Sequence, residues 1–592
     1  MADYDFGPKI KADSTSFRFW CPKFDRVFLV IDGAEPLRMK ADGNGWHHHD
    51  VEGVHPGARY WFLLPDGLEV PDPASRHQPE DVHGPSELVD LAAYRWQTPD
   101  WRGRAWEETV IYELHVGTFT PEGTFRAAIG KLDHLRDLGI TAIQLMPIAD
   151  FPGRYGWGYD GVLPYAPESS YGRPEDLMAL VDAAHARGIS VFLDIVYNHF
   201  GPDGNYLTVY APLFSDRHKT PWGNGINYDG EDSRPVREFV IQNALYWIDR
   251  FRFDGLRLDA VHGIVDDSAE HLLHELARRV REAAGDRHVH LIVENEENDA
   301  SLLVRDERGN PRHFTAQWND DIHHVLHVAT TGETFGYYGD YVADPDNLER
   351  ALAEGFVFQG QLMPYRGEAR GQPSAHLPPT AFISFIQNHD QIGNRAIGDR
   401  MAAGHPPEPL KAIAAVCLLA PQIPMLFMGE EWGAKTPFPY FCDFNEELNE
   451  KVREGRRKEL ARLPGFDADD AIDPTSEDTF RAAKLDWNFD STGQDMLAFY
   501  RELLAIRARE IVPRLKGIKG NSAHYEAGAP VTVVRWTLRD GARLSLAANL
   551  TSRSVETTAS ANGRPIFTLG QVEPGAIGPW SVVWAIEDEP LG

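Results

Sequence analysis

Short apolar runs alternate with polar residues along residues 13–99, and Gly, Pro and Asp separate the runs. Side chains of a strand point to alternate faces, so this two-residue period predicts strands with one buried face. Repeats of about 8–12 residues are typical of a β-sandwich. We therefore predict an N-terminal β-sandwich over residues 1–100, with six aromatic residues interpreted mainly as packing: Phe17, Phe19, Trp20, Trp46, Tyr60 and Trp61. The run 46–50 (WHHHD) is read as a strand face, not as a metal site, because no spaced ligand accompanies it.

The pattern changes near residue 108, where wholly apolar runs begin to alternate with helical stretches such as residues 125–139. Wholly apolar runs indicate strands buried on both faces, as in a parallel sheet covered by helices. The runs are VIYELHV, TAIQLMPI, SVFLDIVY, DGLRLDA, HVHLIVE, FTAQW, AFISFIQ and PMLFMGEE. Eight such runs predict an α/β fold, a closed eight-stranded parallel β/α (TIM) barrel over residues 101–510.

Alternation returns beyond residue 510 in VTVVRWTL, RLSLAANL and WSVVWAI, which predicts a C-terminal β-sandwich over residues 511–592. The most apolar stretch, residues 412–429, is interrupted by Gln422 and two prolines. It is interpreted as a buried helix followed by a buried strand and not as a membrane span.

Composition narrows the classes of partner. The 592 residues include 58 Lys+Arg and 89 Asp+Glu, a net charge of −31, which argues against nucleic acid or an anionic membrane surface as a partner. The chain has three distant cysteines, Cys21, Cys417 and Cys442, and no CxxC pair. Reduced thiols and an N-terminus without an apolar signal region predict a cytoplasmic protein.

Polar residues gather where four of the predicted strands end, in the segments 194–199, 257–262, 294–296 and 387–390. The carboxyl ends of barrel strands share one mouth, so these clusters predict an active site there. Several carboxylates with histidines and an arginine suit cleavage of a glycosidic bond. Arg257 lies two residues before Asp259, so both side chains point to one face and the guanidinium would keep Asp259 ionised as a nucleophile.

At these clusters the chain resembles the α-amylase superfamily of glycoside hydrolases, through DIVYNH (194–199), GLRLDAVH (255–262), LIVENE (291–296) and IQNHD (386–390). The resemblance implies a retaining mechanism. It implies that Asp259 is the nucleophile, Glu294 the general acid/base and Asp390 the carboxylate that helps to distort and hold the sugar. It also implies sugar binding by Arg257, His199, His389 and, as a stacking platform within WGYDG, Tyr159.

The barrel is similar in more detail to malto-oligosyltrehalose trehalohydrolases, through ELHVGTFTPEGTF, QWNDDIHH (317–324) and FIQNHDQIGNRA (385–396). This resemblance implies hydrolysis of the α-1,4 bond beside a terminal trehalose, with maltooligosyltrehalose as substrate and trehalose as product. It also makes the N-terminal domain carbohydrate-binding-like, although its aromatic pattern favours packing. The candidates for the trehalose side are His262, Glu296, Trp318, Asn319, Asp320 and Trp222. Core packing is an equal alternative for Trp318, and a helix cap is an equal alternative for Asp320.

We predict neither a cofactor nor a metal ion, because carboxylates carry all the chemistry of this reaction. The segment from Phe200 to about Pro235 is too short for the large calcium-binding excursion of many α-amylases, and Asn198 is interpreted as a hydrogen-bonding strut. Two other functions stay open. One is a glucan branching or debranching enzyme, and the other is an inactive glucan-binding protein, which the intact Asp259, Glu294 and Asp390 disfavour.

Overall fold

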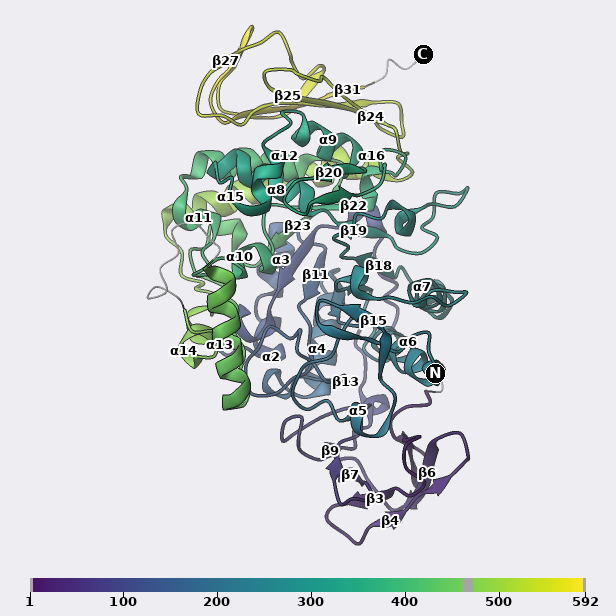
Figure 1. Cartoon of the computed structure of the whole chain (residues 1–592). Coiled ribbons are helices and arrows are strands. Elements are labelled where there is room, and N and C mark those ends of the chain that lie inside the picture. Colours follow the sequence, from purple (N-terminus) through teal and green to yellow (C-terminus); the bar gives the residue numbers. More distant parts are fainter. Residues whose placement is uncertain (1–3, 462–471, 589–592) are drawn as a thin grey trace.

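The computed structural model describes residues 4–461 and 472–588, arranged as a barrel between two β-rich ends (Figure 1). The N-terminal end has two sheets, in the orders β1-β2-β6-β5 and β4-β3-β7-β8, with β9 on β7. Phe19 on β2 stacks on Phe62 on β7 with ring centroids 4.2 Å apart, so aromatic packing joins the sheets as predicted. The strands are β1 Lys9–Ile10, β2 Ser14–Trp20, β3 Phe28–Ile31, β4 Leu37–Arg38, β5 Lys40–Ala41, β6 Trp46–Glu52, β7 Arg59–Leu63, β8 Glu69–Val70 and β9 Ser86–Glu87.

The eight predicted strands form a closed parallel barrel in sequence order, which confirms the fold class. They are β10 Ile111–Leu114, β11 Ala142–Leu145, β14 Ser190–Ile195, β17 Gly255–Leu258, β18 His290–Val293, β19 Ala316–Trp318, β22 Phe382–Phe385 and β23 Ile423–Phe427. All eight are fully buried, which is why they read as unbroken apolar runs. The register sets Asp194 beside Arg257 across β14 and β17.

Helices cover the outside of the barrel. The longer ones include α4 Pro174–His185, α6 Ser233–Arg250, α7 Leu272–Ala284, α8 Asp320–Thr331, α12 Pro407–Leu419 and α15 Ser491–Ile506. The stretch 125–139, predicted as one helix, is divided into α2 (Phe125–Ile129) and α3 (Leu132–Leu138). Gly130 donates its main-chain N–H to the carbonyl of Ala127, which tightens the last turn of α2, and glycine weakens a helix interior.

The C-terminal end has a five-stranded sheet, β24-β25-β26-β31-β28, and a three-stranded sheet, β27-β30-β29. The Trp584 indole on β31 donates to the carbonyl of Ala415 in α12 at 3.0 Å, so the larger sheet docks directly on the barrel. The strands are β24 Ala523–Tyr525, β25 Thr532–Thr537, β26 Arg543–Asn549, β27 Val555–Glu556, β28 Arg564–Leu569, β29 Val572–Glu573, β30 Ala576–Ile577 and β31 Ser581–Glu587. The exact domain boundaries, 100/101 and 510/511, stay predictions.

The apolar stretch 412–429 lies in α12 and β23, a buried helix followed by a buried strand as predicted. Throughout the two described ranges, no helix combines the length and the apolar character that a membrane crossing needs.

Candidate active site

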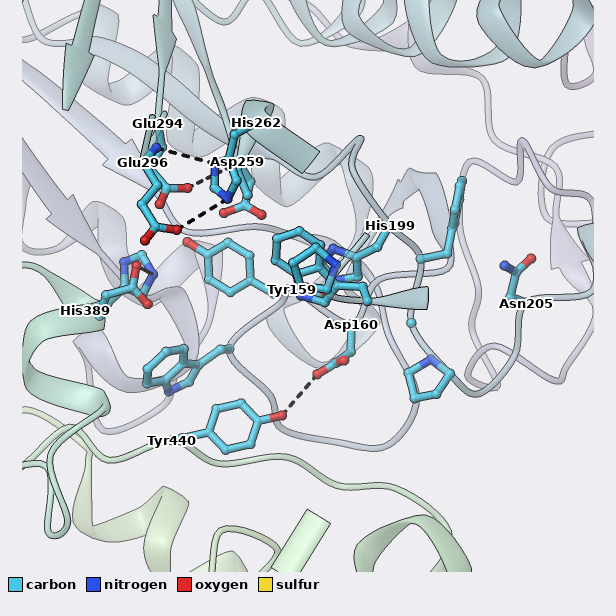
Figure 2. Close-up of a pocket in the computed structure, with 18 of the residues that line it drawn as sticks. Tyr159, Asp160, His199, Asn205, Asp259, His262, Glu294, Glu296, His389 and Tyr440 are labelled. Carbon is cyan, nitrogen blue, oxygen red and sulfur yellow. Dashed lines mark hydrogen bonds and ion pairs between the residues drawn. The ribbon is translucent and has the colours of Figure 1, made fainter. Parts of the chain in front are cut away.

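A pocket of about 880 Å³ opens where the barrel strands end (Figure 2). Asp259 follows β17, Glu294 follows β18, and Asp390 lies in α10 (His389–Gly393) after β22. Asn388 caps α10 by accepting the main-chain N–H of Asp390, which fixes the start of that helix. The predicted site residues that line the pocket are Tyr159, His199, Trp222, Asp259, His262, Glu294, Glu296, His389 and Asp390.

The Arg257 guanidinium lies at the centre of the site, but it is fully buried and does not line the pocket, so the implied direct sugar binding by Arg257 is corrected to a role through its carboxyl partners. Its Nη1 lies 2.7 Å from the Asp194 carboxylate and 2.8 Å from the Asp259 carboxylate. Its Nη2 lies 3.1 Å from the Glu294 carboxyl. One cation therefore draws together three carboxyl groups that arise from three neighbouring strands, because adjacent parallel strands end at the same height.

Two further contacts orient the carboxyl groups. Asn198 donates from Nδ2 to the Asp259 carboxylate at 2.7 Å and to its carbonyl at 2.8 Å, which confirms the predicted strut. Ala260 has a left-handed backbone, with φ of 39°, and donates its N–H to Glu294 Oε2 at 2.7 Å. A left-handed alanine costs of order 1–3 kcal/mol, and strain of this kind is found where a site needs one geometry.

Carboxyl groups outnumber the cations that face them. Burial raises the pKa of Glu294 well above its ordinary value, and Asp259, Asp390 and Asp320 raise it further against the opposing effect of Arg257. Burial also raises the pKa of Asp194 to about 7 despite its contact with Arg257. A carboxyl that keeps its proton near neutral pH can act as a general acid, which suits Glu294.

Aromatic rings border the carboxyl groups. The Tyr159 ring stacks on His389, with centroids 5.1 Å apart, and its hydroxyl donates to Asp194 at 2.8 Å. His199 stacks on Trp222 at 5.2 Å and contacts the Tyr159 carbonyl through Nε2 at 3.0 Å. Such faces suit the apolar side of a sugar ring, while the hydroxyl and imidazole groups suit its edges.

His389 has an anionic partner that sequence reasoning missed. The Glu113 carboxylate on β10 lies 2.6 Å from His389 Nδ1, and Asp390 lies 3.4 Å from Nε2. Burial alone would lower the pKa of His389, but the charges of Asp390 and Glu113 outweigh it and raise the pKa to about 9. The available signal was strand parity, because Glu113 lies two residues after Ile111, a side chain of the barrel interior.

Three of the predicted trehalose-side residues, Trp222, His262 and Glu296, line the pocket, whereas the partly buried Asp320 does not. His262 Nε2 lies 3.7 Å from the exposed Glu296 carboxylate. Asp320 lies in the first turn of α8 and accepts from Gln391 Nε2 at 3.3 Å. Burial, opposed by Arg370 and reinforced by Asp390, raises the pKa of Asp320 to about 7. The N-cap of α8 is Asn319 and not Asp320, so the structure does not support the helix-cap alternative, whereas Asp320 does act on the pKa of Glu294.

Trp318 and Asn319, by contrast, do not line the pocket, and each is 1% exposed. The Trp318 ring packs in the barrel interior with the Arg257 guanidinium 4.1 Å above it. Asn319 points the opposite way and donates to the carbonyl of Gly355 at 2.8 Å. The structure therefore supports the core alternative for Trp318 and corrects the direct-binding prediction for both residues, because Arg257 covers the Trp318 ring and the Asn319 side chain is bound to the Gly355 carbonyl.

The pocket has other lining residues that the sequence interpretation did not select. Trp157 and Asp160 flank Tyr159 in the WGYDG segment, so that motif held a signal for them. Asn394 lies in the FIQNHDQIGNRA segment, which also held a signal, whereas Asn205, Tyr440 and Phe214 at the start of β15 (Phe214–Thr220) have no recognisable pattern.

Among the described residues, one group outside the pocket has the spacing of metal ligands: His218, Asp229 and Asp267, with ligand atoms within 4.8 Å of one another. The Arg217 guanidinium lies 3.3 Å from the Asp229 carboxylate and so already supplies positive charge there. The pocket itself presents carboxyl, imidazole and aromatic groups, and these suffice for the acid–base chemistry considered below.

Comparisons with known proteins identify the family of the chain. The family model for the catalytic domain of alpha amylase matches residues 82–212, and a domain of unknown function (DUF3459) matches residues 520–584. The malto-oligosyltrehalose trehalohydrolase of Deinococcus radiodurans is 44% identical over 504 residues, 84% of this chain and 82% of that protein. The one from Saccharolobus solfataricus is 42% identical over 503 residues, 85% and 86% of the two chains.

Two further matches are instructive. A crystal structure from Salmonella typhimurium, provisionally named an alpha amylase, has a TM-score of 0.95 and 47% identity, and the match covers 99% of this chain and 100% of that one. A 1,4-alpha-glucan branching enzyme from Salinibacter ruber is 34% identical, but over only 42% of this chain and 44% of its own.

Proposed function

The chain belongs to the malto-oligosyltrehalose trehalohydrolases of the alpha-amylase family, and from that premise we propose that it hydrolyses the α-1,4 bond beside the terminal trehalose of a maltooligosyltrehalose. The products are trehalose and a maltooligosaccharide. The single observation that supports this chemistry best is the set of carboxyl groups on Arg257 at the mouth of the barrel. The buried cysteines, none of them disulfide-bonded, are consistent with the cytoplasmic setting that we propose.

In the first step Asp259 attacks the anomeric carbon of the last glucosyl unit. The new bond joins a carboxylate oxygen to C1, and the bond from C1 to the trehalose O4 breaks with its electron pair on O4. Glu294 donates its proton to that oxygen, so trehalose leaves as a neutral alcohol. Arg257 and Asn198 hold Asp259 by its two carboxylate oxygens, which orients the nucleophile.

In the second step the ionised Glu294 removes a proton from water, and the water oxygen attacks C1. The ester bond to Asp259 breaks, the maltooligosaccharide leaves, and Glu294 is again protonated. Two inversions give net retention, and such enzymes have catalytic carboxyl groups about 5–5.5 Å apart.

The remaining pocket residues act on the sugar itself. Tyr159 provides a face for the ring at the cleaved position, and His199 borders it. His389 and Asp390 bind hydroxyls of the same ring and favour the flattened shape of the transition state. Interactions that strengthen as the ring flattens lower the barrier directly.

Specificity requires recognition of trehalose hydroxyls and not only of apolar shape. A site that hydrogen-bonds a hydroxyl can reject a ligand without it by ~10⁴-fold, whereas shape alone gives about 10–200-fold. We assign this recognition to His262 and Glu296, with Trp222 as the wall, and to Asp320, which does not line the pocket but lies close enough to Glu294 to raise its pKa.

The test is product analysis with a trehalose-capped oligosaccharide, an uncapped one of equal length and a branched glucan. Trehalose release from the first at the highest kcat/KM is the expected result. Cleavage or formation of α-1,6 branches without trehalose release would instead support a branching or debranching enzyme, a function that the partial Salinibacter match leaves as the weaker candidate.

A further inference from the structure

Glu113 is a buried carboxylate that the two-step reaction does not use. It lies on β10, in the barrel wall beneath the pocket, and its exposed fraction is 0%. Burying a charge without a compensating partner costs free energy, so the residue that compensates the Glu113 carboxylate indicates the role of Glu113.

Both carboxylate oxygens of Glu113 are directed at one residue. Oε1 lies 2.6 Å from His389 Nδ1, and Oε2 accepts the main-chain N–H of His389 at 3.2 Å. Two bonds to the ring and to the backbone of the same residue fix the rotation of the imidazole. The ring is also packed between Tyr159, stacked at 5.1 Å, and Trp157, edge-on at 5.3 Å.

The second ring nitrogen faces another carboxylate, because Asp390 Oδ2 lies 3.4 Å from His389 Nε2. A neutral imidazole has one N–H and one lone pair, so it can donate to only one of two flanking carboxylates. The doubly protonated ring donates to both, and this charge-assisted arrangement is the strong one.

The other ionisable groups that influence His389 and its neighbours come from three strands around it. Arg257 on β17 opposes a positive ring, Asp194 on β14 favours it, and His115 after β10 is buried with its pKa lowered to about 3, mainly by burial. Glu113 and Asp390 are therefore the two groups that decide the charge of the ring. This agrees with the raised pKa of His389.

We propose that Glu113 is a positioning residue that holds His389 as an imidazolium and aims its Nε2–H at Asp390 and the bound sugar. Glu113 touches no substrate and acts through His389. The fixed positive charge offsets part of the carboxyl excess at the cleaved position and keeps a donor in place for a sugar hydroxyl. The kinetic assay of this role rests on the proposed function, but the role itself concerns only the charge and orientation of the His389 ring.

The kinetic test is the pH profile of Glu113→Gln, in which the amide retains size and one acceptor. Losing a carboxylate partner moves a pKa by about 1–3 units, so the alkaline limb of kcat/KM that reports the His389 ring should move to lower pH by about 1–2 units, with a loss of about 2–10-fold at pH 8. In the His389→Gln background the same substitution should have almost no further effect.

Glu431→Gln is the matched control. Glu431 is also fully buried at this end of the barrel and also pairs with a histidine, His134, at 2.9 Å, but His134, unlike His389, does not line the pocket. It should lower thermal stability while leaving the pH profile as in the wild type. A wild-type profile in Glu113→Gln, or full additivity with His389→Gln, would overturn the assignment.

A direct titration separates this inference from the proposed function. Histidine labelled with ¹³C at Cε1, with His389 assigned by its absence in His389→Gln, reports the ring charge without substrate. The His389 signal should titrate at lower pH in Glu113→Gln than in the wild type. If that shift occurs but no trehalose is released from capped substrates, the proposed function fails while the role of Glu113 stands. If no shift occurs, the role of Glu113 fails.

Discussion

Two buried ionic clusters lie at opposite ends of strand β17. The lower cluster is centred on Asp254, whose carboxylate accepts from His185 at 2.8 Å, the Trp101 indole at 2.9 Å, the Val191 main chain at 3.0 Å and Arg287 at 3.3 Å. The upper cluster is the reverse, a single guanidinium shared by three carboxyl groups.

The two clusters differ in their pKa shifts accordingly. Burial alone would raise the pKa of Asp254, but His185, Arg287 and the Val191 main chain outweigh it and lower the pKa. Burial raises the pKa of Glu294 and Asp194, and one cation does not reverse it. A cluster with every acceptor satisfied stabilises the fold, whereas carboxyl groups with unequal proton affinities supply an acid and a base. The comparison matches the general division of a barrel into a stabilising face and a catalytic face.

The strongest way to test this division is to remove one carboxylate from each cluster. Asp259→Asn should lower kcat by at least about 10⁴-fold, the order found when the nucleophile of a covalent mechanism is removed. No glycosyl ester can form, while the amide keeps the size of the side chain. Rates measured by trehalose release, with folding checked by circular dichroism, should show an inactive but native protein. Retention of more than a few per cent of the activity would contradict the assignment.

Asp254→Asn should show the opposite behaviour. Breaking a buried, fully paired charge costs about 3–5 kcal/mol, so urea unfolding should occur at clearly lower denaturant concentration. The pocket lies at the other end of the barrel, so kcat/KM per folded molecule should stay at the wild-type value. Equal losses of activity and stability in both variants would show that the two clusters are not functionally distinct.

The pH dependence of stability sharpens the same contrast. The folded pKa of Glu294 is raised, so the unfolded chain loses that proton first as pH rises, and stability falls above the unfolded pKa of about 4.3. Glu294→Gln cannot ionise, so its stability relative to the wild type should increase from pH 4 to pH 8. The folded pKa of Asp254 is lowered, so its contribution is present above an unfolded pKa of about 3.9 and is lost as pH falls through the folded value.

Melting temperatures of both variants and the wild type from about pH 2 to about pH 8 provide the measurement, because the Asp254 contribution is lost only below its unfolded pKa. The deficit of Asp254→Asn should shrink on acidification while the advantage of Glu294→Gln disappears. Differences that are constant with pH would mean that neither carboxyl titrates differently in the folded and unfolded states.

Most of the barrel could be predicted from the sequence, because each strand is an unbroken apolar run with polar residues at its end. Arg257 and Asp259 could be placed on one face from their spacing alone. Strand parity could also have placed Glu113 inside the barrel, but not its partnership with His389, since 276 residues separate the two. Trp318 and Asn319 were misjudged because their partners, Arg257 over the Trp318 ring and the Gly355 carbonyl at Asn319, come from distant parts of the chain and leave no local pattern.

The smallest expected effect is a change in KM, and it comes from comparing residues at the two ends of β18, the strand beside β17. His262 and Glu296 meet at the rim beyond β17 and β18, while the exposed His288 lies near the other end of β18. His262→Ala removes one hydrogen-bonding group from the proposed trehalose side, a loss of about 1.4 kcal/mol, so KM for capped substrate should rise about tenfold. KM for an uncapped chain of equal length should change less, because that chain presents a different disaccharide at the same place. His288→Ala should change neither value. If His262→Ala affects both substrates equally, His262 binds a feature common to all glucans, and trehalose recognition must be assigned to Glu296, Asp320 or the Trp222 wall.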